Sequence, residues 1–582
     1  MSVGGERNGH SRPESEAHEI GRKLLADWEA SQPTNFFSAD LNLQRSLELY
    51  LGREAYAQVA GRLYAFGETL ARQVDPLVRE ANLASNLPRL ERYDRFSRRV
   101  EEVIFHPSHH QAGRRIYASG LLSLCAEPGS NLLAQAFFYL SSHNGEAGHN
   151  CPLACSAGLI KLLQAVGGQR LAGRYLPGLL AADYDANLKA AQYLTEVQGG
   201  SDVGANSCRA RPLDAAAGTW LLEGEKWFCS NVTADLAVVS ARVAGQGQGT
   251  AGLGAFLLPR RLEDGRLNNL FIRQLKDKLG TRSLATGELE FQNALVYQIG
   301  PSAEGFKNVM RHVINTSRIY NAFGCCGIAR RAYLVAHGYA RYRTAFGRAI
   351  QHYPLVQASL ANMRADSAAM LAGSLHISSL LDELERGETG EEGVQVLRLA
   401  LNLNKYRSAV LAREVVMQAI EILGGNGTIE SFSVLPRLLR DIVVYENWEG
   451  THNVLLAQTQ RDMRRFGGHG PLLEAMRQSF EASGISELRD PGLVETSQTA
   501  AEIEEVLAMD ELTGSLYFRP LMERLTHLYY AACLAVEAGW ELREKADRTK
   551  QRLALLFFQR RALGRQPKEI AYYDDQVGRL AQ

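Results

Sequence analysis

The hydrophobic periodicity of this 582-residue chain changes twice, from helical to strand-like and back to helical. From about Pro33 to Asn187, apolar residues recur three or four positions apart, which is the repeat of one helix face. From about Lys189, short apolar runs and period-two alternation predict strands. Longer helical repeats return from about Glu304. We therefore expect a mainly α-helical protein that carries a central β domain.

The β region contains four strand patterns. Residues Trp220–Phe228 predict a hairpin with its turn near Gly224. Leu236–Val239 is a short continuous apolar run, and Gly254–Leu258 is another, which stops at a proline. Glu288–Phe291 alternates acidic and apolar residues. These patterns predict a compact sheet between the two helical regions.

Two long helix faces follow the β region. The first is formed by Val396, Ala400, Leu403, Tyr406 and Val410. The second is formed by Leu521, Leu525, Leu528, Ala532 and Ala535. A Gly-rich stretch at 466–471 predicts a linker between them. We expect five segments: a disordered N-terminal segment (1–30), a helical domain (31–188), a β domain (189–298), a second helical domain (299–465) and an appended helical domain (466–582).

The composition is that of an ordinary globular protein, with 46% hydrophobic and 22% charged residues. Lys+Arg and Asp+Glu are both 64, so the net charge indicates no polyanionic partner. No apolar run reaches the roughly 18 residues that a membrane-spanning helix needs. The N-terminus is polar and Gly-rich, without the apolar segment of a signal peptide, so we expect it to be disordered and the protein to be cytoplasmic.

The eight cysteines do not have the spacing of a zinc motif. Cys151 and Cys155 are four positions apart, and Cys325 and Cys326 are adjacent, so we expect reduced core thiols. The His-rich stretch at 105–110 has no partner pair at ligand spacing elsewhere in the chain. We therefore expect no metal site.

Two motifs at the start of the β region could hold a planar or phosphorylated ligand. In Leu194–Val203, two glycines precede Ser201, which lets the backbone approach a ligand and offers N–H and hydroxyl donors. The alternative is a Gly-Gly turn with an Asx cap. In Lys226–Asn231, the aromatic residues could stack on a planar cofactor while Ser230 binds its edge. The alternative is that these aromatic residues belong to the core.

Three later motifs have similar alternatives. Arg343–Arg348 could bind a pyrophosphate or form a solvated helix end. Glu421–Gly427 is a Gly-rich helix terminus, which could be only a C-cap. Tyr445–Asn453 places Glu449 beside Trp448, and desolvation by an apolar neighbour raises the pKa of a carboxyl toward that of a general base. The alternative for this glutamate is that it complements a helix dipole.

In this order the motifs resemble those of the acyl-CoA dehydrogenase flavoprotein family, over roughly residues 100 to 465. The resemblance implies a helical domain, a β-barrel-like domain and a four-helix bundle, with FAD between the last two. It implies FAD contacts for Leu194, Thr195, Gly200, Ser201, Phe228, Ser230, Arg343, Phe346, Glu421, Gly424, Gly425, Thr451 and Asn453. It implies substrate contacts for Ser201, Asn315, Arg318 and Gly450.

The resemblance also implies the chemistry. Glu449 would be the base that removes the α-proton of an acyl-CoA thioester while a β-hydride passes to flavin N5. Glu421, Gly424 and Gly425 would reach the FAD of a neighbouring subunit, so we expect a homo-oligomer, most simply a homotetramer. An electron-transfer flavoprotein or a similar acceptor would reoxidise the flavin.

The chain departs from the main family pattern. Val197 and Gln198 replace the usual Pro-Gly, Glu421 stands where Gln is common, and about a hundred C-terminal residues are added. These features resemble the AidB-like subgroup. That subgroup contains a DNA-binding flavoprotein of the adaptive response with weak dehydrogenase activity, and also long-chain acyl-CoA dehydrogenases that do not bind DNA. The resemblance therefore implies FAD and leaves the substrate open.

A basic run in the appended domain is the feature that could distinguish a DNA-binding protein from a dehydrogenase. Between Arg543 and Lys568 there are nine basic and two acidic residues, a net charge of 9 − 2 = +7. A helix with this charge could bind DNA phosphates, with Arg560, Arg561 and Arg565 as candidate contacts. The alternatives are a solvated helix face over a buried apolar stripe, or pairing with the acidic cluster at 502–511.

Overall fold

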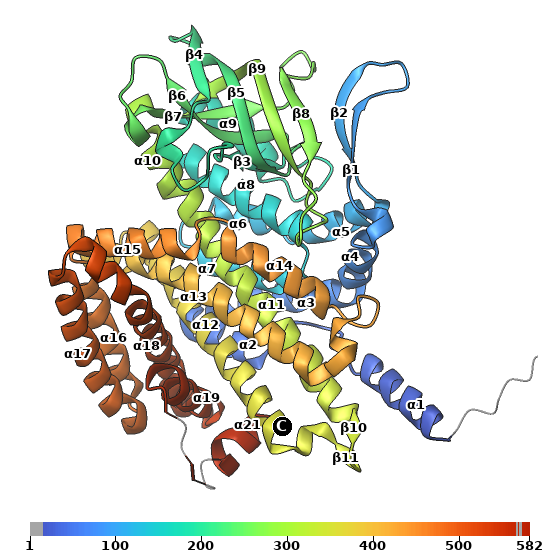
Figure 1. The fold of residues 1–582 in the computed structure, drawn as a ribbon, viewed down its shortest axis with the longest axis vertical. Coiled ribbons are helices and arrows are strands. Elements are labelled where there is room, and N and C mark those ends of the chain that lie inside the picture. Colours follow the sequence, from blue (N-terminus) through green and yellow to red (C-terminus); the bar gives the residue numbers. More distant parts are fainter. Residues whose placement is uncertain (1–15, 566–567, 570–572, 582) are drawn as a thin grey trace, which may run out of the picture.

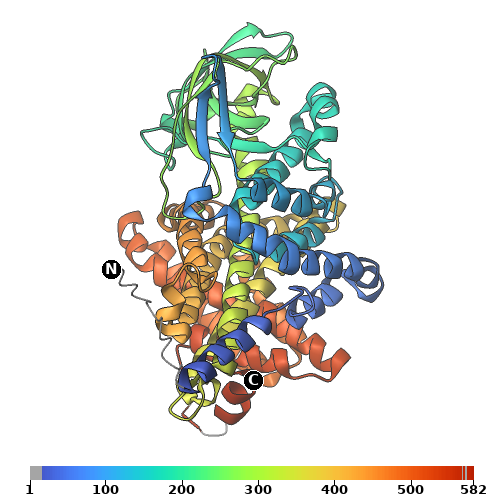
Figure 2. The same ribbon diagram turned by 90° about the vertical axis from the view of Figure 1, so that its right-hand side faces the viewer.

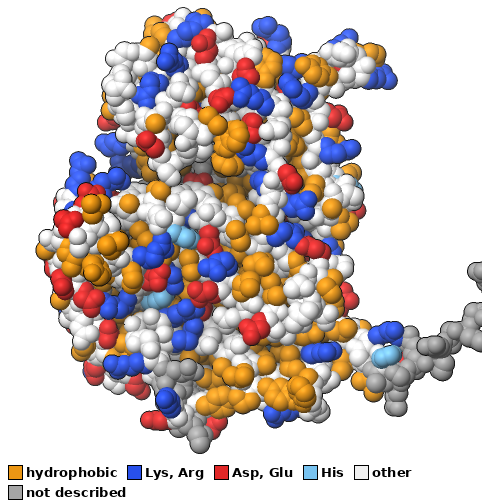
Figure 3. Space-filling view, viewed as in Figure 1, with side chains coloured by type: hydrophobic (Ala, Val, Ile, Leu, Met, Phe, Trp, Pro, Cys, Tyr) orange, Lys and Arg blue, Asp and Glu red, His pale blue; other side chains and the backbone are white. Residues whose placement is uncertain are grey.

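A sheet-containing middle region stands on a larger helical body (Figure 1). The structure is a computed structural model, and it describes residues 16–565, 568–569 and 573–581. The N-terminal helices cover one side of the body (Figure 2), the C-terminal helices lie at the left of Figure 1, and the two groups meet where α2 (Leu41–Leu51) contacts α18 (Glu511–Lys545). The molecule has a hollow where the sheet meets the helical body (Figure 3). The order of helices, strands and helices expected from the periodicity is confirmed.

The N-terminal helices are α1 Glu16–Ala30, α2 Leu41–Leu51, α3 Arg53–Thr69, α4 Asp75–Ala81, α5 Pro107–Tyr117, α6 Leu121–Cys125, α7 Asn131–Ser142, α8 Ala147–Val166 and α9 Gly168–Leu179. The expected disorder of residues 1–30 is wrong for 16–30, and residues 1–15 lie outside the described part of the chain. Trp28 explains the difference, because it is buried and its ring stacks on Phe432 with centroids 5.1 Å apart. Burial of one large aromatic side chain contributes about 1.5–3 kcal/mol, which holds α1 on the bundle.

A hairpin interrupts the N-terminal helices where only helices were expected. Strands β1 Arg89–Tyr93 and β2 Arg99–Ile104 pair antiparallel and stand beside the middle sheet (Figure 2). Arg99 donates to the carbonyls of Leu270 and Asn268 at 3.0 and 2.8 Å, and the buried Glu101 accepts from the Ile272 N–H at 2.9 Å. The hairpin therefore caps the sheet at its β8 side through charged residues, which a search for apolar repeats does not detect.

The middle sheet has seven strands in the order β3-β6-β4-β5-β9-β7, with β8 pairing to β9 and a further pairing of β6 to β7. The strands are β3 Ala190–Tyr193, β4 Arg209–Asp214, β5 Thr219–Ser230, β6 Leu236–Val243, β7 Leu253–Pro259, β8 Leu270–Leu275 and β9 Thr286–Gln298. The apolar strands predicted at 236, 254 and 288 are confirmed. The hairpin turn predicted at Gly224 is wrong, because β5 continues through it. Gly224 has φ +125°, and a Cβ there would lie 2.9 Å from the Cα of Cys208, so this glycine permits β5 to lie close to the segment that leads into β4.

The second helical region contains the long helices that hold most of the core. They are α11 Asn315–Tyr342, α12 Pro354–Arg386, α13 Glu391–Leu423, α14 Leu435–Asn447 and α15 His452–Phe466. On α13, the predicted face is buried at Val396, Ala400, Leu403 and Tyr406 and partly buried at Val410. The short hairpin β10 Thr344–Ala345 and β11 Arg348–Ala349 follows the end of α11.

The appended helices are α16 His469–Ser483, α17 Ser486–Ala508, α18 Glu511–Lys545, α19 Thr549–Phe557 and α21 Arg579–Ala581. They lie along α12 and α13 (Figure 1), and the predicted face of α18 is buried at all five positions. They share one continuous hydrophobic core with the rest of the helical body. Among the described helices, none is long and apolar enough to cross a membrane.

Candidate active site

Glu449 lies in the turn between α14 and α15, and the turn holds its backbone at φ +59°. A left-handed conformation costs a non-glycine residue about 1–2 kcal/mol, and such strain is concentrated at functional sites. The next residue, Gly450, has φ +105° and completes the reversal of the chain. The Glu449 carboxylate accepts a hydrogen bond from Gln192 Nε2 at 2.7 Å. The strained turn therefore directs the carboxylate to the strand that leads into the Leu194–Val203 motif.

Burial raises the pKa of Glu449 to about 7, although part of the residue remains accessible to solvent. The charges of Arg318 and Lys405 oppose this shift only partly, because both cations bind backbone carbonyls. Arg318 Nε donates to the Glu449 carbonyl at 3.1 Å, and Lys405 Nζ donates to the carbonyls of Glu446 and Gly450 at 3.0 and 2.8 Å. The two cations hold the turn while leaving the carboxyl able to exchange a proton near neutral pH.

The support of this site includes two residues that the sequence analysis missed. Gln192 lies on β3 and also accepts from Ser317 Oγ at 3.3 Å, so it links Glu449 to α11. Lys405 is fully buried on α13, and burial lowers its pKa to about 8. The signal that could have revealed Lys405 is a lysine on a helix face that is otherwise apolar, since lysine is rarely buried without a specific partner.

The predicted substrate residues Asn315 and Arg318 lie one helical turn apart on α11, and therefore on one face of it. The guanidinium of Arg318 is held by Asn402 Oδ1 at 2.7 Å and Gln458 Oε1 at 3.2 Å. Arg318 also contacts the Glu449 turn, so the structure brings these two predicted residues together.

The Leu194–Val203 motif forms a turn that a buried ion pair attaches to β5. Lys226 Nζ lies 2.8 Å from Glu196 Oε1, and both side chains are almost fully buried. Lys226 Nζ also donates to the Leu194 carbonyl at 3.1 Å, and the Trp227 N–H donates to the Thr195 carbonyl at 2.9 Å. The structure thus brings the first two sequence motifs into contact.

The exposed face of these two motifs is aromatic and polar. Phe228 is 52% exposed, and the ammonium of Lys276 lies 3.4 Å from the ring centroid of Trp227. Ser230 Oγ lies 3.2 Å from Thr286 Oγ1. Gly200 and Ser201 are exposed at the tip of the turn. Such a surface can stack on a flat ring and hydrogen-bond its edge.

Another group of predicted cofactor residues lies at the far end of α11. Arg343 and the Glu421–Asn426 segment line one open cavity of about 370 Å³. On the neighbouring hairpin Phe346 is 97% exposed, and apolar side chains gather at this end of the body in Figure 3. The predicted substrate residue Arg318 lies in the first turn of α11 and Arg343 caps its C-terminal end, so the two are 25 residues apart, or roughly 37 Å at 1.5 Å per residue. The substrate side of the predicted site and the Arg343 cavity therefore lie at opposite ends of α11.

The remaining predicted cofactor residues, Thr451 and Asn453, lie at the start of α15 and are exposed. Asn453 Oδ1 accepts a hydrogen bond from Arg519 of α18 at 2.5 Å. The appended domain therefore reaches the edge of the active-site turn, a contact that the sequence analysis did not predict.

The candidate DNA contacts are mostly engaged inside the protein. Arg560 and Arg561 both pair with the fully buried Asp366 of α12, and Arg561 also binds Glu414 Oε2 at 2.6 Å. Arg565 is exposed. The predicted pairing of the basic run with the acidic cluster at 502–511 is wrong for these two arginines, because the carboxylates that bind them come from α12 and α13. Their charges attach the appended domain to the bundle.

Three family profiles match the chain. Residues 28–186 match the adaptive response protein AidB N-terminal domain, 191–294 the acyl-CoA dehydrogenase middle domain, and 303–463 the acyl-CoA dehydrogenase C-terminal domain. Acyl-CoA dehydrogenase family member 11 of Caenorhabditis elegans is 32% identical over 460 residues, which cover 77% of this chain and 73% of the relative. Putative acyl-CoA dehydrogenase AidB of Escherichia coli (strain K12) is 33% identical over 402 residues, covering 67% and 71%.

Solved structures have the same fold. The crystal structure of Caenorhabditis elegans ACDH-11 in complex with C11-CoA matches with a TM-score of 0.81 and 27% identity, covering 90% of this chain and 92% of that one. A structure titled Bd2924 apo-form matches with a TM-score of 0.80 and 28% identity, covering 87% and 98%. The chain belongs to the acyl-CoA dehydrogenase family of FAD-dependent oxidoreductases, and within it to the AidB-like group.

The residues of this chain fit an FAD molecule. The Phe228 face offers an aromatic platform, and the hydroxyls of Thr195 and Ser230 lie on the two motifs that border it. At the other cluster, Gly424 has φ +62° and open space where a Cβ would stand, so its backbone can approach a phosphate or ring closely. Both surfaces have the character that the cofactor of this family requires.

Proposed function

We propose that this protein is an acyl-CoA dehydrogenase that introduces an α,β double bond into an acyl-CoA thioester. The observation that supports this proposal most directly is the geometry of Glu449. It is a carboxyl with a pKa near 7, aimed by a strained turn and held by Gln192. A base with these properties is suited to removing a weakly acidic carbon-bound proton at neutral pH.

The proposed reaction begins with the thioester lying between the Glu449 carboxylate and the Phe228 face. Glu449 takes the α-proton, and Arg318 and Lys405 keep its turn in place while that proton moves. The role of FAD, when bound, would be to supply the acceptor for the hydride of the β carbon. Hydrogen bonds to the thioester carbonyl would stabilise the negative charge that develops as the α-proton leaves.

We propose a homo-oligomer in which two chains build each cofactor site. The position of the Arg343 cavity at the end of α11 away from Arg318 supports this arrangement, because a second copy can bring its own Arg343 end to the first copy's Phe228 face. The exposed side chains of Phe346 and Leu355, 97% and 84% accessible in the single chain, provide apolar surface for such a contact. An electron-transfer flavoprotein or a similar acceptor would reoxidise the flavin.

The test of the proposed function is an anaerobic titration of the purified flavoprotein with acyl-CoAs of increasing chain length. We include C11-CoA because the ACDH-11 structure contains it. We expect the flavin absorbance to bleach over one range of chain lengths, because the bound thioester reduces the flavin. A protein that carries flavin and is bleached by no acyl-CoA of any length would contradict the proposal.

The alternative function is DNA binding in an alkylation or stress response with little dehydrogenase activity. The match to the AidB N-terminal domain favours keeping this alternative, whereas the pairing of Arg560 and Arg561 with Asp366 argues against it.

We expect duplex DNA to bind only in the non-specific range, about 10⁻⁴–10⁻⁶ M at physiological salt. Arg565→Gln, which removes an exposed charge, should leave that affinity almost unchanged in fluorescence anisotropy titrations. Tight binding with a steep salt dependence that Arg565→Gln reduces would support the alternative.

A further inference from the structure

Three buried side chains from two separate stretches meet beneath the middle sheet: His109 of α5, Glu146 at the start of α8, and His149 in its first turn. One ligand atom from each lies within 4.8 Å of the other two. All three residues are at most 6% exposed. We propose that they bind a divalent transition-metal ion, most suitably Zn²⁺.

The hydrogen bonds of His149 prepare it as a ligand. Its Nε2 lies 2.8 Å from the backbone carbonyl oxygen of His109, so Nε2 carries the proton and donates. That tautomer leaves Nδ1 with a free lone pair. Metal-bound histidines usually donate their other ring N–H to a carbonyl or a carboxylate in this way.

His109 is a buried imidazole whose ring nitrogens have no hydrogen-bond partner in the described part of the chain. Its ring lies between Phe105 and His149, with centroid distances of 4.2 and 4.1 Å. Stacking accounts for the burial of the ring and satisfies neither nitrogen. The ring nitrogen that carries no proton is therefore free to bind an ion.

Glu146 supplies the negative charge. Its carboxyl accepts from Ser283 Oγ at 3.1 Å and Asn82 Nδ2 at 3.2 Å, and no ion pair to it is found among the described residues. Both of these donors are neutral groups, so the carboxylate keeps oxygen lone pairs for a cation.

Two imidazole nitrogens and one carboxylate oxygen are a ligand set that Zn²⁺ accepts, with a fourth position open to water. Ligand atoms about 2.1 Å from a tetrahedral ion lie roughly 3.4 Å apart, so the ligand atoms, which lie within 4.8 Å of one another, would approach by at most about 1.4 Å on binding. Rotation of His109 can provide this movement, because no hydrogen bond holds its ring. The bound ion would tie α5 and α8 to the Ser283 loop, which continues into Thr286 beside Ser230.

The sequence analysis expected no metal because it searched for ligand pairs at motif spacing. Glu146 and His149 are 37 and 40 positions beyond His109, and only the packing of α5 against α8 brings them together. The test is metal analysis of the flavoprotein purified from zinc-supplemented cells, by plasma mass spectrometry. We expect about one zinc ion per chain, retained through dialysis because the site is buried.

Variants test the assignment of the ligands. Glu146→Gln and His149→Gln should lose the metal, and His110→Gln should keep it. His110 is the matched control, because it adjoins His109 and bonds Tyr184 at 3.2 Å without belonging to the cluster. Metal that persists in Glu146→Gln and His149→Gln would overturn the proposal, as would a zinc-free parent protein.

A second measurement covers the case in which a ligand variant does not fold. X-ray absorption spectra of the zinc-loaded parent should fit two imidazoles and one carboxylate. The cobalt-substituted parent should show the visible d–d bands of a four-coordinate site. A spectrum with sulfur ligands, or with oxygen ligands alone, would assign the ion to other residues and overturn the proposal.

Discussion

Glu449→Gln is expected to abolish the reduction of bound flavin by acyl-CoA while the protein keeps its flavin. The amide cannot accept the α-proton, and loss of a positioned general base typically costs about 10²–10⁴-fold in rate. Among the described residues, no second carboxylate contacts the Gln192 amide, so none at this position can replace Glu449 as the base. We therefore expect a loss of at least about 10³-fold. Glutamine keeps the size of the side chain and can still hydrogen-bond Gln192. The measurement is stopped-flow absorbance of the flavin after mixing with saturating acyl-CoA.

Glu446→Gln is the matched control. Glu446 lies three residues earlier and carries the same functional group, but its carboxylate binds His452 at 3.0 Å and also Arg413. We expect the control to reduce flavin at nearly the parental rate. Equal losses in both variants would show that the turn had been disturbed as a whole. Full activity in Glu449→Gln would remove it as the base.

The raised pKa of Glu449 gives the same variant two pH signatures. The ionised carboxylate is the active form, so the parental rate should fall by about tenfold per pH unit below pH 7 and level off above it. The second signature concerns stability. The folded pKa is raised above the ordinary value of 4.5, so ionisation costs folded-state stability increasingly as pH rises from 4.5 through 7. Glu449→Gln should therefore unfold at a higher temperature than the parent at pH 8, and equally at pH 4.

Much of this site follows from sequence because its parts are local. Each part consists of a few adjacent residues: the strained turn at Glu449, the Gly-Gly turn before Ser201 and the aromatic end of β5. Their order along the chain is a one-dimensional property that a sequence displays directly. Helix faces such as that of α13 are also local, because a repeat of 3.6 residues records which side is buried.

The features that the sequence analysis missed depend on contacts between distant segments. Gln192 becomes significant only because β3 lies beside the α14–α15 turn, 257 positions later. The error at Gly224 has the same origin, since a glycine in a strand marks either a turn or a close approach, and only the neighbouring Cys208 decides which. The partner of the basic run is equally distant, because the buried Asp366 lies almost 200 positions before the arginines that it binds.

Lys550→Met is expected to destabilise the protein by about 3–5 kcal/mol, because it leaves a buried carboxylate without its cation. Lys550 pairs with Glu537 and donates to Ser46 Oγ at 2.6 Å, and Ser46 Oγ donates to Glu537 Oε2 at 2.7 Å. Glu537 is fully buried, and its second carboxylate oxygen has no partner among the described residues. The measurement is urea unfolding followed by circular dichroism, with hydrogen exchange to locate the loss in α2, α18 and α19.

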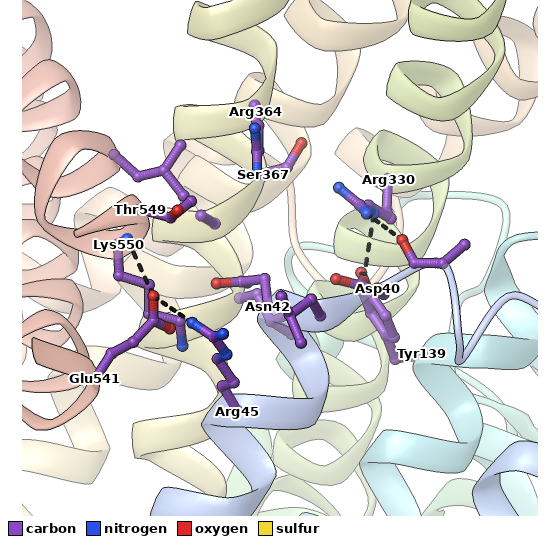
Figure 4. Close-up of a pocket in the computed structure, with 15 residues that line it drawn as sticks. Asp40, Asn42, Arg45, Tyr139, Arg330, Arg364, Ser367, Glu541, Thr549 and Lys550 are labelled. Carbon is purple, nitrogen blue, oxygen red and sulfur yellow. Dashed lines mark hydrogen bonds and ion pairs between the residues drawn. The ribbon is translucent and has the colours of Figure 1, made fainter. Parts of the chain in front are cut away.

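This triad stands beside a polar cavity of about 160 Å³, into which Arg45, Glu541 and Lys550 project from α2, α18 and α19 (Figure 4). Arg45 Nη1 lies 2.9 Å from Glu541 Oε1 and 2.8 Å from Asp547 Oδ2. The junction between the appended domain and the N-terminal helices is therefore made of charges. Loss of Lys550 should loosen this junction before the rest of the protein unfolds, so exchange in β5 and α13 should change little.

Two further variants separate burial from charge. Lys550→Met combined with Glu537→Leu removes both members of the pair, and it should recover most of the lost stability because a well-packed apolar pair is often as stable as a buried ion pair. Arg477→Met removes two ion pairs on the exposed face of α16, where Arg477 lies 2.7 Å from Glu474 and 2.5 Å from Glu481, and it should leave the stability almost unchanged. If Lys550→Met cost no more than Arg477→Met, the triad would not hold the appended domain, and the apolar contacts of Leu553 and Phe557 would suffice. If the double variant were no more stable than Lys550→Met, the cost would come from lost packing of the lysine stem rather than from the unpaired carboxylate.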